Sequence, residues 1–202
     1  TVDGYWIGAT EVTQAQWESV MGTDIRQQRD KTDSSWSIYG EGSNYPMYYV
    51  NYDEAKEFCR RLSERTGRSY TLPTEAQWEY AARGGRDGVR DNYTYSGSNS
   101  IGPVAWYYGN SGNSTNPVGR KSPNQLGLYD MSGNLWEWCL DWFGSYSSSS
   151  QTNPTGPSSG YYRVLRGGSW FNFESRCRVT NRDVNYPSCR DYSLGFRVVC
   201  LP

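Results

Sequence analysis

Apolar residues recur with helical spacing in residues 50–67. Four of them occupy the i, i+3, i+4 and i+7 positions that line one face of a helix: Ala55, Phe58, Cys59 and Leu62. Asn51 precedes this stripe and has the side chain of a good N-cap. The pattern therefore predicts an amphipathic helix that begins just after Asn51.

Two other stretches, residues 12–22 and 72–85, repeat one local pattern. In each, a threonine is followed three residues later by a glutamine and then by Trp-Glu. This is the arrangement of a capping box, with Thr13 or Thr74 as N-cap, and Gly22 and Gly84 mark the two ends. The sequence thus predicts three short helices in all.

From about residue 86 onward the chain is rich in Gly, Ser and Asn, and its apolar runs are too short for helices. Residues 70–72 and 161–166 read as short strands, and residues 194–200 (LGFRVVC) as a closing strand. Residues 145–160 are of low complexity and predict a mobile surface loop. No long linker divides the chain, so we expect one domain over residues 1–202.

Charge and composition exclude several classes of function. The formal net charge is -1, with 20 basic and 21 acidic residues, so the chain has no excess of positive charge that would indicate nucleic-acid binding. No apolar run approaches the roughly 20 residues that span a bilayer, so we expect no membrane insertion by this domain. The chain has no histidine, which excludes Ser-His and Cys-His catalysis. Its five cysteines show no C-x-x-C pair or zinc spacing.

The stretch 166–198, RGGSWFNFESRCRVTNRDVNYPSCRDYSLGFRV, has a mixed character that periodicity does not explain. Its ends, RGGSW and LGFRV, look like sheet framework, whereas its middle mixes aromatic, acidic and small residues without a period. Aromatic residues make up 16% of the chain and occur with abundant Gly, Ser and Asn. That mixture is typical both of loop-rich folds and of adaptable binding surfaces.

Four stretches together resemble one family: GYWIGATEVTQAQWESVMG, RSYTLPTEAQWEYAARGG, NQLGLYDMSGNLWEWCLDW, and RVLRGGSW followed by LGFRV. In this order they are similar to the domain of formylglycine-generating, sulfatase-modifying enzymes, over almost the whole chain. The resemblance implies an α+β architecture, the C-type lectin fold of the formylglycine-generating subtype. In that subtype ordered loops are long, and helices and strands are few and short.

The enzymes of this family oxidise a substrate cysteine with a pair of cysteines a few residues beyond the GGS turn. Here the corresponding residues, 171–176, contain no cysteine, and Cys177 matches a structural cysteine of the family. A thiolate is the nucleophile and metal ligand in such chemistry, and no neighbouring side chain replaces it. The sequence therefore predicts no catalytic residue and no catalytic cofactor. The alternative is an oxidase of this class with displaced chemistry.

The segment 166–198 resembles a second branch, the variable proteins of diversity-generating retroelements, more than it resembles the enzymes. The variable lipoproteins of spirochaetes are proteins of this kind that the segment resembles. In these proteins template adenines are randomised, and an AAY codon becomes NNY, which never encodes Trp, Met, Lys, Gln or Glu. With 177–182, Pro187 and Arg190 set apart as a fixed frame, every residue from 171 to 193 except Glu174 obeys this restriction. We call 166–198 the variable segment.

The resemblance predicts a binding module whose variable segment contacts the ligand. The ligand would be a protein or other macromolecule whose identity the sequence does not give, and a scaffold domain with a partner elsewhere is a further alternative. Single aromatic residues of the set could instead belong to the core. The predicted ligand-binding residues are Phe171, Asn172, Phe173, Ser175, Arg176, Asp183, Val184, Asn185, Tyr186, Ser188, Cys189, Asp191, Tyr192 and Ser193.

The motif NLWEW raises the question of a structural calcium ion. The family enzymes hold calcium with side chains and carbonyls around this motif, and the matching positions are Asp130, Gly133, Leu135 and Glu137. Carboxylates and backbone oxygens suit a hard cation. The alternative is that Glu137 caps backbone amides while the two tryptophans of the motif pack in the core.

Two further expectations follow from the resemblance. The family links its central helix to the closing strand by a disulfide; Cys59 matches one partner, but Cys200 lies two residues beyond the other. We therefore predict at most one disulfide and a free, buried Cys177. The branch also implies a cell-surface or extracytoplasmic protein, lipid-anchored through a segment that precedes Thr1.

Overall fold

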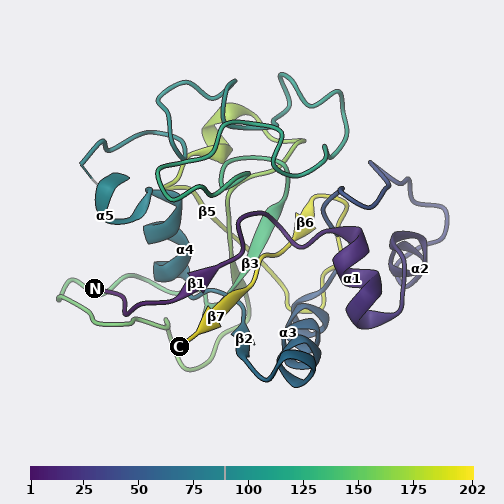
Figure 1. Cartoon of the computed structure of the whole chain (residues 1–202), viewed down its shortest axis with the longest axis horizontal. Coiled ribbons are helices and arrows are strands. Elements are labelled where there is room, and N and C mark those ends of the chain that lie inside the picture. Colours follow the sequence, from purple (N-terminus) through teal and green to yellow (C-terminus); the bar gives the residue numbers. More distant parts are fainter. Residues whose placement is uncertain (89) are drawn as a thin grey trace.

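The computed structural model describes residues 1–88 and 90–202, which form two small sheets, five helices and long ordered loops (Figure 1). The α+β, loop-rich architecture agrees with the prediction. In chain order the elements are β1 (Trp6–Ile7), α1 (Gln14–Met21), α2 (Ile25–Asp30), α3 (Tyr52–Thr66), β2 (Ser69–Thr71), α4 (Glu75–Ala82), α5 (Gly85–Gly88), β3 (Trp136–Trp142), β4 (Arg163–Arg166), the 3-10 helix η1 (Glu174–Cys177), β5 (Arg182–Asn185), β6 (Leu194–Gly195) and β7 (Val199–Leu201).

The three predicted helices are confirmed as α1, α3 and α4. Thr13, Asn51 and Thr74 each accept a hydrogen bond from the backbone N–H three residues on, which completes a capping box. Gly22 ends α1 in the left-handed region, at φ 75°, which a residue without Cβ adopts without strain.

The predicted total of three helices is wrong, because α2 and α5 were not expected. α2 has six residues and buries only Ile25 and Gln28, too few for a helical period to be visible. It nevertheless has its own capping box between Asp24 and Gln27, and that local signal could have revealed it. α5 contains only four residues, two of them glycine.

The strands form a sheet of order β1-β7-β2 and another of order β5-β4-β3-β6. The single closing strand predicted for 194–200 is wrong, because this stretch divides between the two sheets. β6 pairs in parallel with β3, whereas β7 pairs with β1 and β2. Between them, the carbonyls of Phe196 and Val198 accept hydrogen bonds from Val12 and Gly8 instead. The final stretch of the chain therefore joins the two sheets.

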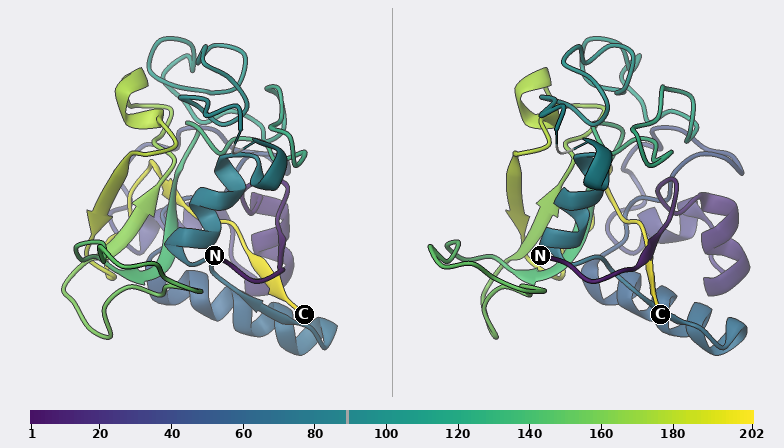
Figure 2. Two further views of the ribbon diagram at one scale, coloured as in Figure 1. Left: turned by 90° about the vertical axis from the view of Figure 1, so that its left-hand side faces the viewer. Right: turned by 60° about the vertical axis from the view of Figure 1, so that its left-hand side comes forward.

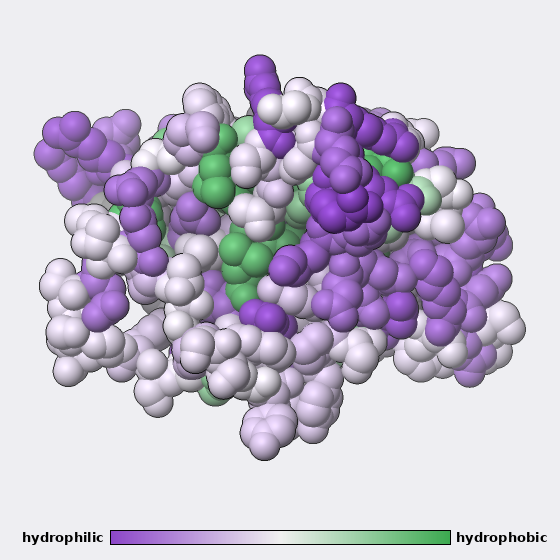
Figure 3. All heavy atoms as spheres, turned by 90° about the horizontal axis from the view of Figure 1, so that it is seen from below, coloured by the Kyte–Doolittle hydropathy of each residue, from purple (hydrophilic) through white to green (hydrophobic). Residues whose placement is uncertain are grey.

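The core lies between α1, α3 and the two sheets. Trp17 stacks on Phe58 with ring centroids 5.8 Å apart, and Phe196 meets both rings edge-on. Loops cover the opposite end, where residues 90–135 contribute no helix or strand (Figure 2). Charged side chains gather over the outer side of α3 (Figure 3). Among the described residues, no helix combines the length and apolar character needed to cross a bilayer.

One buried ion pair connects these parts. The Arg197 guanidinium donates to both carboxylate oxygens of Glu137 at 2.7 Å, and both side chains are completely buried. Trp78 of α4 donates its indole N–H to Glu137, also at 2.7 Å. Arg197 further donates to the carbonyls of Gly8 and Tyr129. The pair thus connects β3 to α4, to Gly8 near the start of the chain and to residues 196–198, which join the two sheets and which we call the joining stretch.

Glu137→Gln should lower the free energy of unfolding by about 3 to 5 kcal/mol, because it removes the only carboxylate that is hydrogen-bonded to the buried Arg197 charge among the described residues. Chemical denaturation measures the loss. The matched control is Glu41→Gln, which breaks the solvent-exposed pair with Arg26 and should leave the unfolding free energy almost unchanged. Equal effects of the two variants would contradict the role assigned to the buried pair.

Candidate binding face

The variable segment runs from the end of β4, through η1 and β5, to the joining stretch. Its two ends are buried: residues 164–170 and 194–197 are inaccessible to solvent. In contrast, all fourteen predicted ligand-binding residues are exposed or half-buried. In Figure 2 this part of the chain, coloured yellow-green, lies along one side of the molecule. The sequence contrast between ends and middle therefore corresponds to a contrast in burial.

The glycines of the RGGS turn allow η1 to lie directly against the end of β4. Gly168 has φ 76°, and a Cβ there would lie 2.8 Å from both the Arg176 carbonyl oxygen and the Cys177 sulfur. Asn172 closes the turn, because its side-chain oxygen accepts hydrogen bonds from the backbone and hydroxyl of Ser169. This predicted contact residue therefore also has a structural role.

Two carboxylates outside the variable segment hold arginines inside it. Arg182 donates to both oxygens of Glu75 at the start of α4, and Arg190 to both oxygens of Glu54 in α3. Burial alone would raise the pKa of Glu54, but hydrogen bonds from Arg190 and Lys31 hold it below its usual range. Such bidentate pairs fix position as well as charge.

Backbone contacts complete this attachment. The carbonyl of Pro187 accepts from the Tyr52 N–H at 3.0 Å, and that of Asp191 from the Tyr49 N–H at 3.1 Å. Arg182, Pro187 and Arg190 are positions that the sequence pattern had set apart as frame. They are also the positions through which the segment is fastened to α3 and α4.

The aromatic residues of the segment lie at the surface. Phe171, Phe173 and Tyr186 expose 51%, 68% and 55% of their area, which argues against a place in the core. Tyr192 is half-buried, with its ring centroid 5.7 Å from that of the buried Trp170. Arg176 and Asp183, both partly exposed on this face, carry opposite charges and lie 3.7 Å apart.

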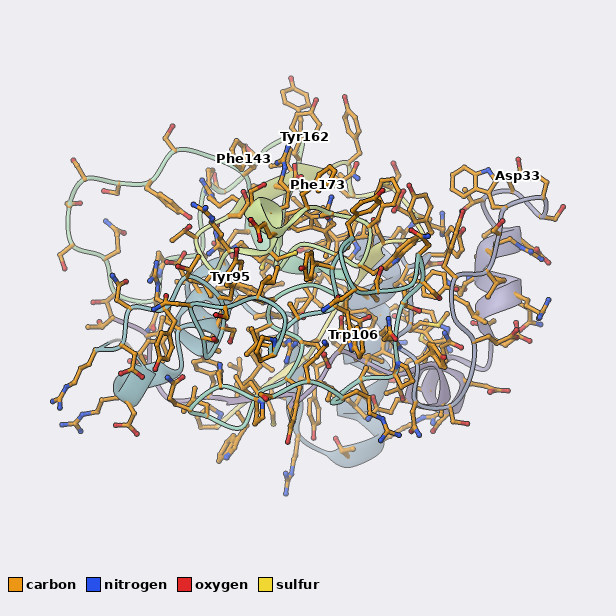
Figure 4. The ribbon with its side chains drawn as sticks, turned by 90° about the horizontal axis from the view of Figure 1, so that it is seen from above. Asp33, Tyr95, Trp106, Phe143, Tyr162 and Phe173 are labelled. Atoms are coloured by element: carbon orange, nitrogen blue, oxygen red, sulfur yellow. The ribbon has the colours of Figure 1, made fainter. Side chains whose placement is uncertain are left out.

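Aromatic residues from outside the segment support these side chains. Tyr108 packs on Phe173 with centroids 4.9 Å apart, and Tyr162 packs on Tyr186 at 4.6 Å. Figure 4 shows Phe173 and Tyr162 on the same side of the molecule. Sequence reasoning missed both supporting tyrosines. The Tyr-Tyr repeats at 107–108 and 161–162 were the available signal, but nothing in the sequence places them beside the segment.

The cysteines offer no activated thiol on this face. All five are free, so the Cys59–Cys200 bridge implied by the resemblance is not formed. Cys177 is fully buried, as predicted, and burial raises its pKa to about 12. Burial also raises the pKa of Cys189. A nucleophilic cysteine needs the opposite shift, toward the thiolate.

The positions predicted to hold calcium are all buried, but their donor set does not fit a cation well. One side-chain oxygen of Asp130 is buried without a hydrogen-bond partner, as an ion ligand could be. Both oxygens of Glu137, however, are engaged by the buried Arg197, whose charge would repel a cation. Within 1–88 and 90–202, no three His, Cys, Asp or Glu side chains form a metal-binding group. Calcium binding at Asp130, Gly133, Leu135 and Glu137 stays a prediction.

A cavity of about 770 Å³ lies beside the face, and no sequence signal indicated it. α4, the end of β3 and the mostly exposed loop 144–157 enclose it, and Trp142, Tyr80 and Tyr146 contribute aromatic walls. Arg182 reaches its edge, stacked on Tyr146 with 4.0 Å to the ring centroid.

Known proteins give this geometry a context. The family described as Sulfatase-modifying factor enzyme 1-like domain matches residues 1–201. Among solved structures, Treponema denticola variable protein 1 is similar, with a TM-score of 0.86 and 32% identity over 100% of this chain and 86% of that one. The predicted lectin-type fold of the formylglycine-generating subtype is therefore confirmed.

Two curated relatives belong to different kinds of protein. The formylglycine-generating enzyme of Streptomyces coelicolor is 40% identical over 169 residues, which is 76% of this chain. The chain spans only about half of that enzyme, 52%. The chaperone protein LppX of Paenibacillus barcinonensis is 32% identical across 98% of this chain and 81% of its own length.

Phe173→Ala should change the free energy of unfolding by under about 1 kcal/mol, because the ring is mostly exposed. Trp170→Ala, three residues earlier and 2% exposed, should lose about 3 to 5 kcal/mol. Thermal or chemical unfolding of both variants tests this contrast between frame and face. A Phe173 variant as unstable as the Trp170 variant would show that the middle of the segment is core after all.

Proposed function

The chain belongs to the family of Sulfatase-modifying factor enzyme 1-like domains, and on this premise we propose that it is a non-catalytic protein that displays a variable binding surface. One observation carries the proposal: the fourteen residues marked by the codon pattern all reach the surface, between two buried ends. The two buried residues between 171 and 193, Cys177 and Val179, both belong to the part set apart as frame. Because these side chains lie at the surface, they can vary while the fold stays stable.

The family includes enzymes, and the missing chemistry supports a different role for this chain. Residues 171–176, where the catalytic cysteines of the enzymes would lie, contain no thiol. Cys177 beside them is enclosed and strongly biased toward the neutral thiol. Fold alone does not transmit activity, because activity resides in particular side chains.

The physical properties of the face suit macromolecular recognition. Exposed aromatic rings supply large contact areas with few rotatable bonds, and the supporting tyrosines hold them in place before binding. The near-balance of charge argues against nucleic acid as ligand. We propose a protein or other macromolecule as ligand, and an extracytoplasmic, lipid-anchored location. The similarity to Treponema denticola variable protein 1 supports diversification by a retroelement.

A display library tests the binding role. Positions 171, 173, 175, 176, 183–186, 188 and 191 are randomised with NNY codons, and the library is selected on a purified probe, lysozyme. We expect most variants to fold and some to bind, with binding lost when the parent residues are restored. The control library randomises an equal number of positions in the exposed loop 145–158. Widespread unfolding, or equal enrichment from the control, would refute the proposal.

An oxidase assay tests the alternative. A peptide carrying the substrate cysteine is incubated with the protein, copper and oxygen, and formylglycine is measured by mass spectrometry. We expect no product above the level with copper alone, because burial raises the pKa of both thiols in the variable segment, Cys177 and Cys189. Product formation that Cys189→Ala removes would establish displaced enzymatic chemistry.

A further inference from the structure

β5 forms one open edge of the four-stranded sheet. The sheet order is β5-β4-β3-β6, and within the described part of the chain β5 pairs only with β4, with Val184 opposite Val164. In Figure 2, left, β5 is the outermost strand of this sheet. An edge strand presents backbone N–H and C=O groups that another extended chain can pair with.

Two side chains of β5, those of Asp183 and Asn185, occupy two of the backbone donors along this edge. The Val184 N–H donates to Asp183 Oδ1, and the Tyr186 N–H donates to Asn185 Oδ1, both at 2.9 Å. Residues two apart in a strand direct their N–H groups to the same side, so both donors lie on the side away from β4. The second Asp183 oxygen faces Arg176 at 3.7 Å, which orients the carboxylate.

We propose that the side chains of Asp183 and Asn185 shield the open edge of β5 from pairing with a second copy of this chain. A second copy fits because β5 can pair with itself about a two-fold axis at Val184. In that register Arg182 faces Tyr186 and Asp183 faces Asn185, so no like charges lie opposite each other. Such pairing needs the outward N–H groups of Arg182, Val184 and Tyr186, and Asp183 and Asn185 now hold the last two of these three.

The shield gives these two positions a second role beside ligand contact. Both belong to the residues proposed to vary, so a substitution there changes the exposed edge as well as the face. Apolar β-branched residues would both release the donors and favour an extended strand. The hydrogen bonds of Asp183 and Asn185 shield the edge whether or not the face binds a ligand.

Sedimentation velocity of D183V/N185V, at about 1 to 100 µM, tests the shield. We expect a concentration-dependent dimer at tens of micromolar. The matched control is S175V/S188V, which places two valines at exposed positions of the same segment outside β5. Adding V184P to the first variant should abolish the dimer, because proline removes an outward N–H without touching the β4 ladder. Association no stronger than in the control, or a dimer that V184P leaves intact, would overturn the proposal.

Hydrogen exchange gives an independent reading in the monomer. In dilute D183A/N185A, the Val184 and Tyr186 amides should exchange at least about fivefold faster than in the original chain, while the β4 amides are unchanged. Unchanged rates at both amides would show that the side chains do not hold the edge. The proposal would also be overturned if the unsubstituted protein already formed a dimer through β5 and V184P removed that dimer.

Discussion

The enclosed pair between Arg197 and Glu137 is the contact on which the rest of this architecture depends. Two charges excluded from water must satisfy each other, and their remaining donors and acceptors must find partners. Here those partners come from α4, from the first residues of the chain and from the loop at Tyr129. A chain with so few long helices and strands gains its specific arrangement from polar contacts that only one geometry satisfies.

The same principle separates framework from face in the variable segment. Its frame is fastened by buried or half-buried ion pairs and by backbone hydrogen bonds, all directed inward. Its middle makes mainly aromatic surface contacts that other residue types could replace. The attachment of the segment and the composition of its exposed face thus depend on different side chains within about thirty residues, so the face can change without loss of stability.

The sequence predicted what is local and missed what depends on distant partners. Capping boxes located α1 and α4, and an apolar stripe behind the N-cap Asn51 located α3, because these signals lie within a few residues of one another. The division of 194–200 between two sheets was not predictable, since a strand pattern does not name its neighbour. The resemblance and codon pattern indicated the site residues, but Tyr108 and Tyr162 enter it only through the fold. Nor could charge alone reveal that Arg197 would select Glu137, 60 residues away.

The ion pairs of Arg182 and Arg190 affect the order in which parts of the molecule fold during synthesis. Arg182 meets a partner 107 positions earlier, and Arg190 one 136 positions earlier. Contacts of such long range form late, because the intervening chain must first be ordered. On the ribosome, α3 and α4 are made well before the arginines that dock on them. We therefore expect the variable segment to dock late in folding, onto a body whose helices are already formed.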